Sequence, residues 1–343
     1  MAASAQGISI QLDSGTFKVL GWTPPTTAQN WSSVLVVYAG AGDVPPLAGS
    51  HAVENGILVF RPRYPISPGV QYRAVFQPSG GSKITKTFDG PPRDTTPVAR
   101  VTQIYPSADV LPSNQLRLYI YFSVPMSRGE AAQHLHIVDE NGKTLEGSES
   151  VLLRGEELWD ATFQHLTMTF DPGRIKRDLT SNQMIGPPIA EGKRYTLIVD
   201  RDWKDARGVP MVEGFRKVYR GGPALRTPPD PKLWKVTAPK ARALAPVTID
   251  FPSPMNYPLM MRMIQVSDGR RILAGSIDIQ RQETQWRFTP KEPWPAGDYQ
   301  LIVDTGIEDI AGNRIGQPFD YDNFDRVTER ITTKTTSLRF TVR

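Results

Sequence analysis

Cysteine is absent from the 343-residue sequence, and histidine occurs only four times. A chain without cysteine forms no disulfide, no zinc–thiolate site and no thiol nucleophile. Long apolar runs are also missing: the longest, near residues 34–41, covers about eight residues, against roughly 20 for a membrane-spanning helix. The sequence therefore excludes cysteine chemistry and predicts no transmembrane segment.

Charge of one sign is not concentrated anywhere either. The 40 lysines and arginines are nearly balanced by 35 aspartates and glutamates, and no part of the chain gathers the surplus. Recognition of nucleic acid requires a basic stripe with a reading element, so we expect no nucleic-acid partner. Glycine (28) and proline (31) exceed average usage while 39% of residues are hydrophobic, which indicates a folded, turn-rich protein.

The N-terminus resembles a processing site. Residues 1–6, MAASAQ, contain a small-residue A-x-A sequence of the kind that ends a signal peptide, but no apolar segment precedes it. We expect a mature secreted protein whose leader has been replaced. An ordinary small-residue N-terminus is the alternative that this pattern leaves open.

A short motif occurs twice and indicates duplication. FSVPM at residues 122–126 returns as FPSPM at 251–255, each time after residues that alternate apolar and polar with the period of a strand. Proline cannot donate to a sheet ladder, so we expect the strand to end there and the methionine to fill the edge of the core. The recurring residues are Phe122, Pro125 and Met126, and Phe251, Pro254 and Met255.

Two further elements recur along the chain, one in all three parts and one in the last two. A glycine precedes a tyrosine by two or three residues at Tyr72, Tyr195 and Tyr299, which is typical of the tyrosine corner of immunoglobulin-like sandwiches. Ten residues after the last two tyrosines, an Asp-x-x-Gly sequence predicts a turn in which aspartate binds nearby backbone and glycine adopts positive φ. These residues are Asp205 and Gly208, and Asp309 and Gly312.

Segments rich in proline and glycine, residues 90–97 and 221–231, separate three strand-rich blocks. The pattern predicts an all-β protein of three tandem immunoglobulin-like antiparallel β-sandwiches at 1–95, 96–228 and 229–343. The first block lacks the aspartate turn and is a divergent member. The middle block carries insertions near 152–164 and 174–184, where function is often found.

These motifs, in this order, resemble bacterial Ig-like domains of the Big_5 type. The resemblance covers residues 98–343, is strongest at 122–126 and at DIAGN (309–313), and is partial for 1–95. It implies a tandem sandwich module of secreted and envelope-associated bacterial proteins, used as a spacer, an adhesive element or an accessory to an enzyme. It brings no catalytic residues.

Three sets of residues are candidates for binding or chemistry. Trp159 and Trp203 are the candidates for an exposed pair that stacks on sugar rings, and packing under the inserted loops is the favoured interpretation of the two side chains. The oxygen-rich cluster Asp320, Asp322, Asn323 and Asp325 suggests calcium, although its spacing does not match an EF-hand. His134 and His136 share one side of an expected strand, without the convergent ligands of a metal site.

Together these observations predict a non-enzymatic, secreted or envelope-associated bacterial protein with a structural or binding role. We expect it outside the cytoplasm (secreted, periplasmic or at the cell surface), with a protein or polysaccharide of the cell envelope as partner and no cofactor other than calcium. The oligomeric state stays open. A carbohydrate- or polymer-binding accessory protein that uses the middle insertions is the alternative, and hydrolysis by an acidic pair such as Glu156 and Glu157 is a third hypothesis.

Overall fold

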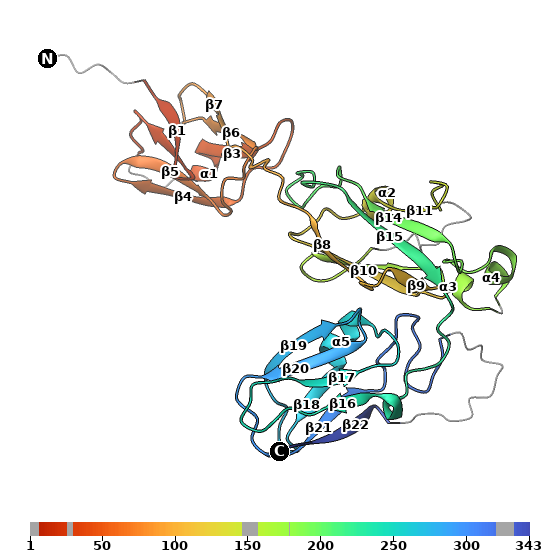
Figure 1. Ribbon diagram of the computed structural model, residues 1–343. Coiled ribbons are helices and arrows are strands. Elements are labelled where there is room, and N and C mark those ends of the chain that lie inside the picture. Colours follow the sequence, from red (N-terminus) through yellow and green to blue (C-terminus); the bar gives the residue numbers. More distant parts are fainter. Residues whose placement is uncertain (1–6, 26–29, 146–156, 178, 320–332) are drawn as a thin grey trace. The chain divides into compact units, whose positions relative to one another are not determined.

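The computed structural model describes residues 7–25, 30–145, 157–177, 179–319 and 333–343. The chain forms two compact units, Met1–Thr96 and Pro97–Arg343 (Figure 1). Both are built mainly from antiparallel strands joined by loops and short helices. Within the described residues, buried hydrophobic side chains form three clusters, one in the N-terminal unit and two in the C-terminal unit. Each cluster lies between two sheets, and we call these bodies the first, middle and third sandwich.

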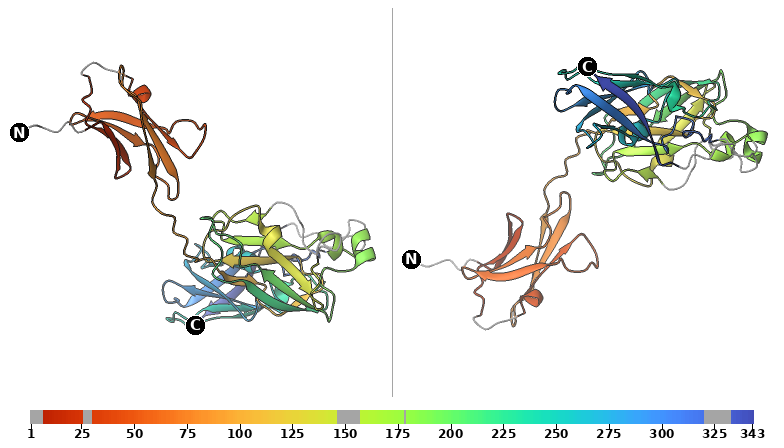
Figure 2. Two further views of the ribbon diagram at one scale, coloured as in Figure 1. Left: turned by 90° about the horizontal axis from the view of Figure 1, so that it is seen from above. Right: turned by 90° about the horizontal axis from the view of Figure 1, so that it is seen from below.

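In the first sandwich, a sheet with strand order β1-β2-β5-β4 faces a second sheet with order β3-β6-β7 (Figure 2). Buried Phe17 and Val19 lie opposite buried Phe60 and Leu58 across the β2–β5 pair, which fixes the inner face. The elements are β1 (Ser9–Asp13), β2 (Thr16–Leu20), α1 (Trp31–Val34), β3 (Leu35–Ala39), β4 (Gly49–Glu54), β5 (Ile57–Pro62), β6 (Gln71–Phe76) and β7 (Ile84–Asp89).

In the middle sandwich the two sheets have the orders β12-β13-β10-β8 and β11-β14-β15-β9, and the β15–β9 pair is parallel. The second inserted segment forms the helices α3 and α4. The elements are β8 (Val101–Tyr105), β9 (Val110–Pro112), β10 (Arg117–Phe122), α2 (Ala131–His134), β11 (Leu135–Asp139), β12 (Leu158–Trp159), β13 (His165–Thr169), α3 (Pro172–Ile175), α4 (Thr180–Ile185), β14 (Arg194–Val199) and β15 (Phe215–Gly222).

The third sandwich pairs a sheet of order β16-β17-β20-β19 with a sheet of order β18-β21-β22. A 3-10 turn at Pro231–Leu233 leads into it. The elements are β16 (Lys235–Thr237), β17 (Val247–Asp250), α5 (Tyr257–Met263), β18 (Ile264–Ser267), β19 (Gly275–Gln280), β20 (Gln285–Pro290), β21 (Gly297–Asp304) and β22 (Thr335–Val342).

All three sandwiches share one topology. When the main strands of each are lettered A to G in chain order, with β9 as an extra short strand, the sheets read A-B-E-D and C-F-G. This is the strand order of a constant-type immunoglobulin sandwich. The expected fold class, all-β with immunoglobulin-like antiparallel sandwiches, is confirmed.

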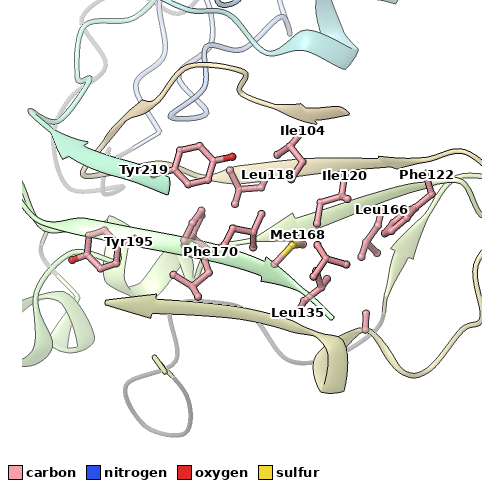
Figure 3. Packing of buried hydrophobic residues seen from close by; sticks show 14 of the residues in the cluster. Ile104, Leu118, Ile120, Phe122, Leu135, Leu166, Met168, Phe170, Tyr195 and Tyr219 are labelled. Carbon is pink, nitrogen blue, oxygen red and sulfur yellow. The ribbon is translucent and has the colours of Figure 1, made fainter. Parts of the chain in front are cut away.

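The middle core shows how the strand pattern becomes packing (Figure 3). Leu118, Ile120 and Phe122 alternate along β10 and are buried. Leu118 lies opposite Met168 and Ile120 opposite Leu166 on β13. Burial of each such side chain contributes about 1.5–3 kcal/mol, so the alternation in sequence fixes which face of β10 turns inward.

A tyrosine near the start of strand F binds upstream backbone in every sandwich, at Tyr72, Tyr195 and Tyr299. In the first two, the hydroxyl accepts a hydrogen bond from the N–H of Ser67 (2.7 Å) and of Ala190 (2.9 Å). In the third, it donates to the carbonyl oxygen of Pro295 (2.9 Å). Each bond ties the loop between strands E and F to the core, which is the geometry of a tyrosine corner.

The proline–methionine motif leaves the sheet and pairs with the aspartate turn. Met126 forms an isolated β-bridge with Asp205, and Met255 forms the same bridge with Asp309. Both methionine side chains are buried at the ends of their cores. The backbone that proline removes from the ladder thus finds partners at the turn between strands F and G.

Tyr195→Phe tests the tyrosine corner. Loss of the hydroxyl leaves the N–H of Ala190 without its acceptor, so we expect unfolding in urea to show a loss of about 1–3 kcal/mol. Tyr64→Phe removes the same atom from a ring that is 71% exposed, and a change below about 0.5 kcal/mol is expected. Equal losses in the two variants would contradict the structural role of the hydroxyl.

Candidate functional site

Inside the C-terminal unit, one sheet face of the middle sandwich contacts one end of the third sandwich. The rings of Tyr105 (β8) and Tyr257 (α5) stack with centroids 3.5 Å apart and 9° between their planes. The hydroxyl of Tyr119 (β10) accepts a hydrogen bond from Asn256 Nδ2 at 2.7 Å. Asn256 also caps α5, because its Oδ1 accepts from the N–H of Leu259 at 3.3 Å. We call the contacts between these two sandwiches the junction.

Glu283 supplies a buried carboxylate to the junction. It lies at the tip of the β19–β20 hairpin, where Arg281, Gln282 and Glu283 have φ of 54°, 54° and 62°. A left-handed backbone costs about 1–2 kcal/mol per non-glycine residue. The three residues of this hairpin tip therefore adopt a backbone conformation that they disfavour on their own. The carboxylate accepts hydrogen bonds from the N–H (2.8 Å) and the hydroxyl (2.7 Å) of Ser107. Burial raises the pKa of Glu283.

Ser107 is held from the opposite side by a lysine. The Nζ of Lys217 donates to the carbonyl oxygen of Ser107 at 2.6 Å, and burial lowers the pKa of this amine. At Ser107, in the loop between β8 and β9, the backbone N–H, the carbonyl oxygen and the side-chain hydroxyl therefore all form hydrogen bonds. Its partners come from β15 and from the third sandwich.

A second buried carboxylate, Glu308, bridges one arginine from each sandwich. Its Oε2 lies 2.5 Å from Arg117 Nη1 of the middle sandwich, and its Oε1 accepts from Arg314 Nε at 3.1 Å. The side chain of Glu308 is only 7% exposed. A buried charge needs such pairing, so removal of either partner would leave Glu308 poorly compensated.

The segment between the two sandwiches is fixed at Leu225. Its N–H donates to Asn114 Oδ1 (2.8 Å), and its carbonyl oxygen accepts from Asn114 Nδ2 (2.8 Å) and from Asn313 Nδ2 (2.9 Å). One asparagine comes from each sandwich. The proline-rich connection is therefore clamped to both bodies at this residue.

The aspartate turn of the third sandwich lies against the middle one. Asp309 Oδ1 accepts from the N–H of Ala311 and of Asn313 (2.9 Å each), and Oδ2 accepts from Asn313 Nδ2 (2.7 Å). Burial raises the pKa of Asp309 to about 7. At Gly312 φ is 87°, and a Cβ there would lie 2.4 Å from Leu116 Cδ2, so glycine is required both for the turn and for the close approach.

The two tryptophans predicted to bind sugar lie together, but not as an exposed pair. Trp203 is fully buried in the middle core, as the packing interpretation expects, and is not available as an exposed ring. Trp159 is half-buried, and the centroid of its ring lies 5.9 Å from the ring centroid of Trp203. Its Nε1 donates to Glu157 Oε2 at 2.6 Å. Trp203 follows strand F in a loop without period, so alternation carried no signal for its burial.

Two of the remaining candidates lie in different surroundings from those expected. His134 ends α2 and stacks on Trp203 at 5.8 Å, whereas His136 on β11 lies 3.0 Å from Asp200 Oδ2, so the two rings do not share a strand face. Glu157 caps α2 by accepting from the N–H of Gly129 (2.8 Å) and Ala131 (2.7 Å), while Glu156 lies outside the described residues.

The suggested calcium ligands Asp320, Asp322, Asn323 and Asp325 also lie outside the described residues, so calcium binding stays a prediction. In the part of the chain that the structure describes, no three histidine, aspartate or glutamate side chains are grouped as metal ligands. In the same part, no helix is long and apolar enough to cross a membrane.

The first sandwich contains an apolar pocket of about 160 Å³ beside its tyrosine corner. Ala39, Leu47, Pro62, Val70 and Tyr72 contribute to its lining. A pocket of this size and polarity suits one apolar side chain or ring and lacks the convergent polar groups that orient a substrate.

The junction was not foreseen from the sequence. Its residues lie in loops and on the outward faces of strands, where alternation marks them only as solvent-facing. One signal was available: Tyr105, Tyr119 and Tyr121 give β8 and β10 an aromatic outer face, which is unusual for a solvated sheet.

No protein-family model matches the sequence, and no curated protein matches it either. Among solved structures, the chain is similar to a fragment of Escherichia coli alpha-2-macroglobulin spanning domains MG0-NIE-MG1, with 10% identity over 71% of each chain and a TM-score of 0.24. It is also similar to the N-terminal part of the bacterial S-layer protein SbsC (11% identity, 71% of this chain, 44% of that one, TM-score 0.25). The chicken CNTN1 FN1-FN3 domains give 10% identity over 98% of both chains with a TM-score of 0.22. Likenesses this weak carry no argument about activity, and the fold is established by the strand order above.

Glu283→Ala tests the junction. The variant deletes two hydrogen bonds to a buried carboxylate, so we expect the C-terminal unit to lose about 1.5–3 kcal/mol in urea unfolding of the full chain. Glu292→Ala removes an exposed glutamate from the same sandwich and serves as control. Equal stability of the two variants would show that the Glu283–Ser107 contact does not hold the sandwiches together.

Asp309 predicts a pH dependence of stability. Its pKa in the folded protein is about 7, against an ordinary value of 3.8, so between these values the unfolded chain releases a proton that the folded chain keeps. The stabilisation is complete below about pH 4 and is lost as the pH rises through 7; the raised pKa of Glu283 acts in the same direction. Unfolding in urea at pH 5 and pH 8 measures the difference.

Substitution separates Asp309 from other titrating groups. Asp309→Asn should reduce the stability difference between pH 5 and pH 8, because an amide at this position does not titrate. An unchanged difference in Asp309→Asn would contradict the assignment.

Proposed function

We propose that the protein is a non-enzymatic, secreted or envelope-associated bacterial protein in which immunoglobulin-like sandwiches serve as a structural and binding arm. The observation that carries this proposal is the junction, where an aromatic stack, two buried carboxylates and a clamped connection join the middle and third sandwiches. Flexible connection is the default between neighbouring domains unless their interface is large or specific. A specific junction is what an arm needs to present a surface at a fixed orientation.

The Big_5-type resemblance supports the same proposal. It leads us to place the protein outside the cytoplasm and to divide it into three modules near residues 1–95, 96–228 and 229–343. The absence of cysteine is compatible with an oxidising compartment, because such a chain has no thiols to oxidise. The partner is then a protein or polysaccharide of the envelope.

The carbohydrate-binding alternative is less well supported. It relied on two exposed tryptophans, of which one is buried and the other uses its indole N–H internally. The first inserted segment, residues 152–164, is described only from residue 157 onward.

Fractionation of cells that produce the protein naturally tests its location. We expect antibody detection in the envelope, periplasmic or secreted fraction, and labelling by a membrane-impermeant amine reagent after the outer layers are opened but before the cytoplasmic membrane is lysed. A cytosolic marker protein processed in parallel controls for lysis. Recovery with that marker, unlabelled until lysis, would contradict the proposal.

A further inference from the structure

The outward face of the β11-β14-β15-β9 sheet carries three rows of side chains whose order is set by the strand register. The first row is Arg194, Arg220 and Val110, the second is Val138, Thr196 and Val218, and the third is His136, Ile198 and Arg216. Arg216 and Arg220 are four residues apart on β15, roughly 13 Å along the strand. We call this surface the arginine face; its sheet is the one labelled β11, β14 and β15 in Figure 1.

Two of the arginines lie directly opposite each other in the ladder. Arg194 on β14 is the cross-strand partner of Arg220 on β15. Like charges in this position repel and destabilise a sheet. Both side chains are exposed, as is that of Arg216. The Arg194–Arg220 pair therefore lowers the stability of the fold. Residues that lower stability without compensation are typical of binding sites.

No carboxylate of the described residues pairs with Arg194, Arg216 or Arg220. Two acids at the margin of the face are engaged elsewhere: Glu140 accepts from Lys193 Nζ at 2.6 Å, and Asp200 lies 3.0 Å from His136. A third, Asp109, is exposed beside Val110, and its backbone carbonyl oxygen accepts from the N–H of Arg220 at 2.8 Å. The face thus presents three guanidinium groups, each able to hold a carboxylate with two parallel hydrogen bonds.

Aliphatic side chains fill the space between the arginines. Val218 is 56% exposed and Val110 is 53% exposed, and Val138, Thr196 and Ile198 lie half-buried beside them. An apolar centre with arginine at its margin is the composition of a protein–protein interface.

We propose that the arginine face is a docking surface for an acidic protein segment that carries aliphatic residues between its carboxylates. The carboxylates pair with Arg194, Arg220 and Arg216, and the aliphatic residues cover Val138 and Val218. The pairing relieves the repulsion between Arg194 and Arg220, so the partner removes a cost that the free protein bears.

Other occupants fit less well. Sugars stack on flat aromatic rings, and the one ring in the three rows, His136, is at the margin and bound to Asp200. A nucleic acid or polyphosphate would satisfy the arginines but leave the valines facing a hydrophilic backbone. A second copy joined through the same face would set arginines against arginines, because a two-fold contact places identical patches together.

The inference rests on the binding role proposed above and adds the class of partner. The two fail separately. If the arginine variants bind an acidic peptide as tightly as the wild type does while the protein fractionates with the envelope, the proposed docking role of the arginine face is wrong and the proposed location stands. If the protein is cytosolic yet the arginine variants lose binding, the face stands and the location is wrong.

Binding is measured with a synthetic peptide in which glutamates flank a central aliphatic stretch, titrated into the full chain at low salt. We expect Arg220→Glu and Arg216→Glu to weaken binding about tenfold or more, since each substitution replaces an attractive contact by a repulsive one. Arg339→Glu, an equal charge change on an exposed strand position of the third sandwich, should change it less than about threefold by lowering net charge alone. Absence of binding to the wild type, or equal loss in all three variants, would overturn the proposal.

Two comparison ligands decide what the arginines recognise. The same peptide with glutamine in place of glutamate should bind at least about tenfold more weakly, because neutral amides lose the charge-assisted bonds. Polyphosphate of matched charge should bind more weakly than the glutamate peptide. If polyphosphate binds as tightly and is equally sensitive to Arg220→Glu, the face is a general polyanion site and the proposal is overturned.

Stability provides a readout that a structural arginine would not give. Arg220→Glu converts the repulsive pair with Arg194 into an attractive one, so Tm should rise by about 1–3 °C at low salt and by less at high salt. Arg339→Glu, whose cross-strand partner is Gln300, should leave Tm within about 1 °C. A fall in Tm for Arg220→Glu would show that the arginine supports the fold, and would overturn the proposal.

Discussion

The buried aspartate between strands F and G is the group on which the ends of the middle and third sandwiches depend. Asp205 and Asp309 each accept backbone N–H bonds from residues two and four positions later, which closes the turn. The closed turn supplies the β-bridge to Met126 or Met255, whose strand has just lost its ladder at proline. Without that carboxylate the proline–methionine segment would have unpaired backbone at the edge of the core.

The two copies of this turn differ in how the carboxylate is compensated. Asp205 forms an ion pair with Arg207. Asp309 instead accepts a hydrogen bond from the side-chain amide of Asn313, which also donates to the carbonyl oxygen of Leu225. The neutral amide of Asn313 donates both to Asp309 and to the connecting segment, whereas an arginine at this position would introduce a positive charge. The third sandwich thus converts an internal turn into a contact with the connecting segment, and Gly312 allows Leu116 to approach it.

Sequence pattern predicted what is local and repeated. Alternation on β10 identified Leu118, Ile120 and Phe122 as a face, and recurrence identified the tyrosines and the aspartate turns, because both follow from the geometry of one strand or one turn. Alternation by itself could not establish the burial of Trp203, which depends on the loop after strand F folding over the core. Nor could it bring Glu283 to Ser107, since the two are 176 residues apart and meet only when two finished sandwiches dock. The Arg194–Arg220 pair required the register between strands F and G, which composition does not reveal.

The junction and the arginine face use different sheets of the middle sandwich. The junction takes the outward side chains of β8 and β10, including Tyr105, Arg117 and Tyr119, whereas the arginine face is on β14 and β15. In a two-layer sandwich the outer faces of the two sheets point in opposite directions. A partner on the arginine face would therefore leave the third sandwich docked. Lys217 connects the two regions physically, because it lies on β15 between Arg216 and Val218 and its amine reaches Ser107 of the junction. The strand that presents the arginines is thus held in place by the contact that joins the two sandwiches.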